Sequence, residues 1–146
     1  MDESFILGLI AGEGSFSSAL LNQNDTVYIY PIFQMGMSDL DQEIIERMSD
    51  ELDIGTVNNS GGNAGWFVRG QDDVDDLIEF IEDADCELFE LTEKYGQYER
   101  WMKLVEKKRA SEGSRDERAE LIRIARSITD SKAGDGNSAE EWIAKL

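Results

Sequence analysis

The order of patterned segments is the feature that most constrains how this chain of 146 residues can fold. Helices are predicted where apolar residues recur three and four positions apart, over residues 4–13, 41–52, 72–83, 87–110, 115–131 and 139–146. Strands are predicted from β-branched and aromatic runs between turn signals, over residues 15–23, 26–37, 56–60 and 66–70. This order predicts an α+β fold, α-β-β-α-β-β-α, with one four-stranded antiparallel sheet and additional C-terminal helices.

Local signals refine three of these elements. Ser4 is the expected N-cap of the first helix, and Gly14 is expected to end that helix in a left-handed conformation. Pro31 lacks a backbone donor, which favours an edge or irregular position in the second strand. In the long helix the predicted buried stripe comprises Leu88, Leu91, Tyr95, Tyr98, Trp101, Met102 and Val105.

Charge is distributed unevenly along the chain, whose formal net charge is −18. Residues 1–90 contain two basic residues, Arg47 and Arg69, against 21 acidic ones. Residues 91–146 contain 12 basic and 11 acidic residues. A folded, strongly acidic chain is typical of salt-adapted proteins, because molar salt screens the self-repulsion, and this favours an origin in a haloarchaeon or its virus. A DNA-mimicking acidic protein and an ordinary acidic cytosolic domain remain alternative interpretations.

Composition excludes several classes of protein. The chain has no histidine and one cysteine, Cys86, so a Ser-His-Asp triad, an imidazole zinc site and an intrachain disulfide are excluded. It has no glycine-rich phosphate-binding motif, and we expect no small-molecule substrate. The longest apolar stretch, Phe5 to Ala11, is too short to span a membrane. Asp2 and Glu3 precede it, unlike the basic flank of a signal peptide, so we expect a cytoplasmic protein with no membrane partner.

Small residues lie on one face of the first helix. Gly8, Ala11 and Gly12 are three and four positions apart, which would let a second helix approach closely. The helix ends on Glu13, although a carboxylate is unfavourable at the negative end of the helix dipole, and a bound cation would compensate. The alternative is a buried helix whose glycines allow tight packing and whose Glu13 is solvated.

Residues 6–16, ILGLIAGEGSF, resemble the LAGLIDADG signature of homing endonucleases. Gly8, Leu9, Ile10, Gly14, Ser15 and Phe16 match it directly, and Glu13 replaces the final acidic residue with the other carboxylate. The element order over residues 4–110 also resembles this family. We therefore divide the chain into a LAGLIDADG endonuclease-like domain, 1–110, and a C-terminal helical extension, 111–146, with a basic helix at 115–131 and a short helix at 139–146.

The resemblance implies a homing endonuclease that cuts both strands of a specific DNA target. Family members with a single motif form homodimers through their signature helices, which implies a dimer interface at Gly8, Ala11 and Gly12. It also implies that Glu13 of each subunit, with the backbone carbonyl of Gly12, holds Mg²⁺ or another divalent cation. Lys94 matches a basic catalytic residue that the family has early in its long third helix.

Departures from the family pattern concern the polar residues around the site. Ala11 replaces an acidic residue of the signature. Met37 and Asp41 occupy the positions where many members have a glutamine and a basic residue. Either the alignment shifts and Gln34 serves as the catalytic glutamine, or the polar pocket differs.

The outward face of the sheet is the predicted DNA interface. Alternation along the strands separates core residues from outward ones, and Gln, Asn, Arg and Ser suit the edges of bases. The predicted contacts are Ser17, Gln23, Tyr28, Tyr30, Gln34, Asn58, Ser60, Phe67, Arg69 and Gln71. Arg115 and Arg118 of the basic helix are the predicted phosphate contacts. The alternatives are an ordinary half-solvated sheet and an amphipathic helix with solvated arginines.

Two other functions remain open at this point. The same fold without cleavage would be a DNA- or RNA-binding regulator or an intron maturase, which Met37 and Asp41 favour. A DNA-mimicking acidic protein would need no metal, but the uncharged outward face argues against it.

Overall fold

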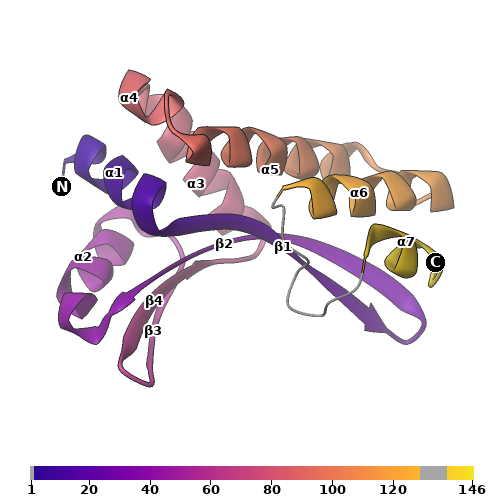
Figure 1. The fold of residues 1–146 in the computed structure, drawn as a ribbon, viewed down its shortest axis with the longest axis horizontal. Coiled ribbons are helices and arrows are strands. Elements are labelled where there is room, and N and C mark those ends of the chain that lie inside the picture. Colours follow the sequence, from indigo (N-terminus) through magenta and orange to yellow (C-terminus); the bar gives the residue numbers. More distant parts are fainter. Residues whose placement is uncertain (1, 129–137) are drawn as a thin grey trace. The chain divides into compact units, whose positions relative to one another are not determined.

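The computed structural model describes residues 2–128 and 138–146 and confirms the predicted α+β fold. Four strands form one antiparallel sheet in the order β1-β2-β4-β3 (Figure 1). Their bounds are β1 (Gly14–Gln23), β2 (Thr26–Ser38), β3 (Thr56–Ser60) and β4 (Asn63–Val68). The register of β4 with β2 begins at Phe33, so Pro31 lies outside that ladder and its missing donor interrupts no bond to β4.

The helices follow the predicted order, but a 3₁₀ turn is added and the predicted long helix is divided in two. A short 3₁₀ turn, η1 (Asp39–Asp41), precedes the second helix, and the Ser38 hydroxyl caps it by accepting from the Leu40 amide. The α-helices are α1 (Glu3–Glu13), α2 (Gln42–Leu52), α3 (Gln71–Ala84), α4 (Glu87–Glu90), α5 (Glu93–Ala110), α6 (Arg115–Ser127) and α7 (Ala139–Ile143). Residues 129–131 of the predicted basic helix lie outside the described residues.

The chain divides into two compact units, each built from separated segments. Unit 1 comprises residues 1–15 and 32–96, and unit 2 comprises residues 16–31 and 97–146. Strands β1 and β2 and helix α5 each contribute to both units.

Unit 1 is organised around the β3–β4 hairpin, which α2 contacts along both strands. Gly61 and Gly62 form its tight turn, with φ of +61° and +82°, a conformation that favours glycine. Strand β4 therefore begins at Asn63, three residues before the predicted start. The buried Trp66 indole donates to the Ile54 carbonyl over 2.8 Å, which ties the loop after α2 to the sheet.

The first helix differs from prediction at both ends. Asp2, not Ser4, is the N-cap, because the Asp2 carboxylate accepts from the Ser4 amide over 2.8 Å. Gly14 is extended, with φ −79° and ψ 160°, because β1 begins directly at this residue. The predicted left-handed end is therefore wrong.

The long helix predicted over residues 87–110 is two helices. The Thr92 hydroxyl accepts from the Tyr95 amide over 3.3 Å, so a new helix starts here and the face predicted to be buried does not continue through α4. Leu88 and Leu91 are 75% and 82% exposed, so their predicted burial is wrong. In α5, Tyr98, Trp101 and Val105 are buried as predicted, and Tyr95 and Met102 are half-buried.

Unit 2 has an aromatic core. Phe16 lies 5.3 Å from Tyr98 and 5.0 Å from Trp101 between ring centroids, and the Trp101 indole donates to the Ser17 carbonyl over 3.0 Å. Helices α6 and α7 pack together, and Trp142 and Ile143 of α7 are buried.

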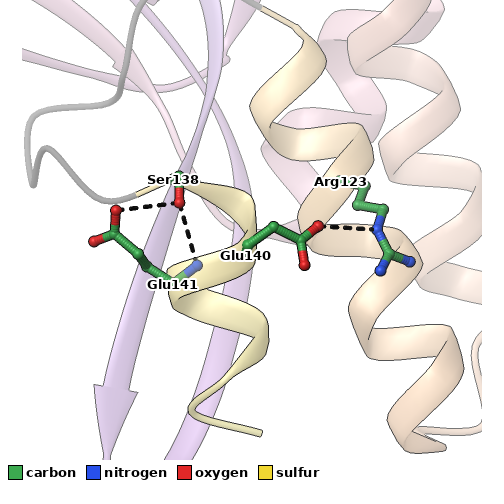
Figure 2. Close-up of polar contacts among 4 residues, drawn as sticks. All are labelled: Arg123, Ser138, Glu140 and Glu141. Atoms are coloured by element: carbon green, nitrogen blue, oxygen red, sulfur yellow. Dashed lines mark hydrogen bonds and ion pairs between the residues drawn. The ribbon is translucent and has the colours of Figure 1, made fainter.

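Polar contacts at the start of α7 supplement this apolar packing. Figure 2 shows the Ser138 hydroxyl accepting from the Glu141 amide over 3.2 Å, which caps α7. It also shows Arg123 of α6 in an ion pair with Glu140 over 3.7 Å.

Candidate nuclease site and DNA-facing surfaces

Glu13 is exposed at the last position of α1, immediately before β1. Among the described residues its carboxylate has no hydrogen-bond or ion-pair partner. Gly14 makes the abrupt junction possible, because a Cβ at this residue would lie 2.7 Å from the Ile10 carbonyl oxygen and 2.8 Å from the Phe33 ring. The junction therefore presents Glu13 from a tightly packed turn.

Lys94 is held at the same junction. Its ammonium, half-buried at the start of α5, donates to the carbonyl oxygen of Gly14. The structure thus places the Lys94 ammonium on the backbone of the residue that directly follows Glu13. Gln34 is exposed on β2, and no hydrogen bond links it to Glu13 in the described part of the chain. Met37 is half-buried and Asp41 is exposed in η1.

The small-residue face of α1 is open. Gly8 and Gly12 are exposed, and a Cβ at either would meet nothing within 4 Å. Ala11 is half-buried, and Phe5 on the same helix is 50% exposed. No contact within the described protomer therefore requires glycine at these two positions, which disfavours the interpretation that they serve internal packing.

In unit 1 the strands present a polar, uncharged outer face. Directly opposed residues of neighbouring strands lie on the same face of a sheet, so the register defines three rows across β2, β4 and β3. The rows are Gln34–Phe67–Thr56, Gly36–Gly65–Asn58 and Ser38–Asn63–Ser60. Gln34, Asn58 and Ser60 are exposed and Phe67 is half-buried, so the predicted alternation is correct here.

Two of the residues predicted to contact DNA, Arg69 and Gln71, lie beyond the end of β4. Strand β4 ends at Val68, so Arg69 lies in the following turn and Gln71 is the first residue of α3. Gly70, with φ of +82°, makes this early turn, and the tendency of glycine for that conformation was the available signal. Both side chains are exposed, and the Arg69 guanidinium carbon lies 4.8 Å from the centroid of the Phe67 ring.

In unit 2 the outward residues of the β1–β2 hairpin include a pair of tyrosines. Tyr28 and Tyr30 are exposed and stacked, with ring centroids 6.2 Å apart. The Lys108 ammonium lies 4.7 Å from the Tyr30 centroid, and burial lowers the pKa of Lys108. Gln23 is exposed and Ser17 half-buried. Sequence reasoning missed Lys108, whose only local signal was a basic last helical turn.

The two arginines predicted to contact phosphate differ in their surroundings. The half-buried Arg118 guanidinium donates to the Val27 carbonyl over 2.8 Å, so it ties α6 to β2 within unit 2. Arg115, the first residue of α6, is exposed. Arg118 thus has a structural bond that a helical pattern alone did not reveal.

The acidic side chains of one protomer do not gather into a metal-binding cluster in the part of the chain that the structure describes. No group of three or more Cys, Asp or Glu side chains is close enough there to hold an ion. Glu13 and the Gly12 carbonyl are hard oxygen donors of the kind Mg²⁺ prefers, but they supply only part of its usual six ligands. In addition, no helix among residues 2–128 and 138–146 is both long and apolar enough to cross a membrane.

Comparison with known proteins identifies the family. The family model of LAGLIDADG endonucleases matches residues 6–105, and the chain belongs to this family. A search of curated proteins found no match.

Solved structures share the fold. The archaeal intron-encoded homing endonuclease I-Vdi141I, solved with DNA, has a TM-score of 0.82 at 22% identity, over 98% of this chain and 92% of its own. I-GzeII, solved with its DNA target, has a TM-score of 0.81 at 21% identity, over 92% of this chain and 47% of its own. I-SmaMI, bound to uncleaved DNA with calcium ions, has a TM-score of 0.79 at 17% identity, over 92% and 47%. This chain therefore spans about half the length of I-GzeII and of I-SmaMI.

Proposed function

We propose that this chain is a homing endonuclease that cleaves both strands of a specific DNA site as a homodimer. The observation that carries the proposal is the open glycine face of α1, which ends at an exposed Glu13 with no partner among the described residues. A second Glu13, brought by a partner subunit across this open face, would add a further acidic ligand for a metal ion. Half-length matches to longer endonuclease chains support a pair of such domains.

In this proposal each residue at the α1–β1 junction has a defined task. Glu13 and the Gly12 carbonyl would hold Mg²⁺ beside the scissile phosphate, with water and phosphate oxygens completing its ligands. When bound, the metal supplies an activated water and stabilises the leaving oxygen. Lys94 holds the Gly14 peptide and so fixes the direction of the Glu13 backbone. Gln34 remains a candidate for orienting the attacking water.

Each unit contributes a separate group of proposed DNA contacts. Unit 1 contributes uncharged side chains of β2, β3 and β4, with Arg69 and Gln71 beyond them. Unit 2 contributes the Tyr28–Tyr30 pair, Ser17, Gln23 and the exposed Arg115. Residues 1–110 would form the endonuclease-like domain and residues 111–146 the helical extension. The acidic composition favours a haloarchaeal, salt-adapted, cytoplasmic protein, and an intron-encoded gene is consistent with this proposal.

Glu13→Gln tests the proposal because it keeps the shape of the side chain and removes the metal-binding charge. We expect a loss of cleavage of about 10³-fold, since metal catalysis supplies several kcal/mol and each 1.4 kcal/mol is tenfold. Binding of double-stranded DNA should remain. Glu3→Gln, which removes an exposed carboxylate from the other end of α1, is the matched control and should cleave normally. Cleavage of a randomised DNA library with Mg²⁺, read by sequencing, measures both variants.

The dimer requires its own measurement. Gly8→Leu places a large side chain on the open face of α1, where a Cβ would meet nothing within 4 Å in the protomer. We expect light scattering to show a dimer for the wild type and a monomer for this variant, which should also lose double-strand cleavage. A monomeric wild type at the concentration that cleaves DNA would contradict the homodimer.

The second candidate function is a DNA- or RNA-binding protein of the same fold that does not cleave. Met37 and Asp41 favour it, because neither supplies the polar or basic group expected at its position. A wild-type protein that binds a defined DNA or RNA sequence without cleaving it under any divalent cation would establish this function instead.

A further inference from the structure

An aromatic side chain occupies an otherwise polar row on the outer face of unit 1. Phe67 lies directly opposite Gln34 on β2 and Thr56 on β3, both of which are exposed. A phenylalanine on this face gains little from the apolar core, whose residues Trp66 and Val68 point to the other side. The half-buried ring therefore needs another explanation.

The space for this ring depends on Gly65. A Cβ at Gly65 would lie 2.7 Å and 2.8 Å from the Cε2 and Cζ atoms of Phe67. Gly65 does not have a positive φ, so its backbone conformation would accept other residues. Glycine is needed at this position because the far edge of the Phe67 ring rests against it.

The ring in turn supports Arg69. The guanidinium carbon lies 4.8 Å from the ring centroid, within the range of a cation–π contact. Arg69 is exposed, and among the described residues it has no ion pair. Arg47, the other basic residue of the first ninety, is 3.9 Å from Glu43. A ring holds the guanidinium without neutralising it, which matters in a unit with 21 acidic residues.

We propose that Phe67, resting against Gly65, is a positioning residue that orients Arg69 to recognise a guanine in the major groove of DNA. The inference rests on the proposed DNA-directed function. A planar guanidinium donates two parallel hydrogen bonds to O6 and N7 of guanine, and stacking restricts the side chain before binding. Restricting a flexible arginine in advance lowers the entropy lost on binding. Each protomer of a dimer would read one such guanine.

Five variants separate this role from ordinary folding. Gly65→Ala pushes the ring away from its seat and changes neither Phe67 nor Arg69. Gly36→Ala is its matched control, because Gly36 lies opposite Gly65 in the same row and its Cβ would meet nothing within 4 Å. Phe67→Leu removes the ring, and Phe67→Tyr keeps it. Arg69→Gln removes the guanidinium itself.

The first measurement is made on the free protein. In the wild type the ring current of Phe67 should shift the NMR signals of the Arg69 side chain upfield. We expect Gly65→Ala and Phe67→Leu to lose this shift, and Gly36→Ala and Phe67→Tyr to keep it. An unshifted Arg69 signal in the wild type would overturn the proposed stack, independently of any DNA activity.

The second measurement is the base preference of bound DNA, selected from a randomised double-stranded library. We expect Arg69→Gln to lose preference for guanine at one position per half-site, by about tenfold to a hundredfold. Gly65→Ala and Phe67→Leu should weaken the same position several-fold and leave other positions unchanged. An equal change at every position, or an equal effect of Gly36→Ala, would overturn the positioning role.

The result also separates this inference from the proposed nuclease. A wild-type protein that selects a DNA sequence but does not cleave it would contradict the proposed endonuclease activity and would leave the proposed role of Phe67 intact. Cleavage with a guanine preference that Arg69→Gln does not alter would remove the inference and leave the endonuclease. A wild-type protein that selects no DNA sequence would overturn both.

Discussion

The two compact units differ completely in charge. Unit 1 contains 21 acidic and three basic residues, so it carries the whole net charge of −18. Unit 2 contains 11 acidic and 11 basic residues and is neutral overall. Yet Glu13, Lys94, Phe67 and Arg69 all belong to the acidic unit. Net charge therefore says little about the partner of a surface, because the placement of the charges decides it.

The strands of unit 1 show how this placement works. The three rows of its outer face contain amides, hydroxyls, glycines and one aromatic ring, and no carboxylate. The acidic residues are concentrated in α2 and α3 and in the segments that follow them. An acidic domain can thus keep an uncharged face, which is the requirement for approach to a polyanion.

Replacing one buried tryptophan in each unit is expected to have the largest effect on stability. The pair of variants tests whether the two units differ in their local stability. Trp66 in unit 1 and Trp101 in unit 2 are fully buried, and each donates its indole N–H to a backbone carbonyl. Replacing either by alanine should cost about 3–5 kcal/mol, because a large cavity forms and a carbonyl loses its donor. Hydrogen exchange should show the greater loss of protection in the mutated unit. Equal losses in both units would contradict their separation.

Salt should affect the two units differently. Raising the salt concentration from 0.1 to 1 M shortens the screening length from about 10 to about 3 Å, which weakens repulsion among like charges. We expect amide protection in α2 and α3 to rise with KCl, and protection in α5 and α6 to change much less. Hydrogen exchange of the wild type at both concentrations measures this. The same increase in both units would mean that charge segregation has no consequence for stability.

The start of α6 gives a pH-dependent effect within the neutral unit. The Glu117 carboxylate is hydrogen-bonded by the Glu112 amide, the Ser114 hydroxyl and the Ser114 amide. These bonds lower its pKa from the ordinary value of 4.5. Because the folded pKa is the lower one, this stabilisation is complete above pH 4.5 and is lost as the pH falls through the folded value. Ser114→Ala should cost about 1 kcal/mol at neutral pH.

Ser114 and Glu117 form a capping box at the start of α6, and Glu117→Gln isolates the contribution of the Glu117 charge to it. We expect the wild type to protect α6 amides better than the variant at neutral pH, with the difference disappearing on acidification. Comparing the two proteins at each pH is necessary, since acid also relieves repulsion in unit 1. A difference that keeps the same size at every pH would show that the carboxylate charge has no role.

The smallest effect is expected at the surface of unit 2. The Arg123–Glu140 pair in Figure 2 is solvent-exposed, so Arg123→Ala should cost only about 0.2–1 kcal/mol. Trp142→Ala removes a buried side chain from α7 and should cost several times more. Thermal unfolding of the two variants compares their losses of stability. A larger loss for Arg123→Ala than for Trp142→Ala would contradict the conclusion that apolar packing holds α7 in place.

Much of the fold could be predicted because its signals are local. Strand alternation correctly separated Gln34, Asn58 and Ser60 from the core, and apolar spacing located α2 and α3. The errors fall at element ends, as at Gly14 and at Leu91, where packing decides between continuation and a new element. The LAGLIDADG signature indicated Glu13 as the candidate metal ligand. Residue spacing alone left open whether the glycines of the first helix serve internal packing.

The sequence by itself determined the order of elements, the hairpin turns and the family signature, because each depends on residues a few positions apart. Only the tertiary structure decided what joins distant segments. The Lys94–Gly14 bond spans 80 residues and the Arg118–Val27 bond 91, and both depend on where helix ends lie in space. The seat of Phe67 on Gly65 involves near neighbours, yet no propensity predicts it, because only the pleat of the strand places the ring over the glycine backbone.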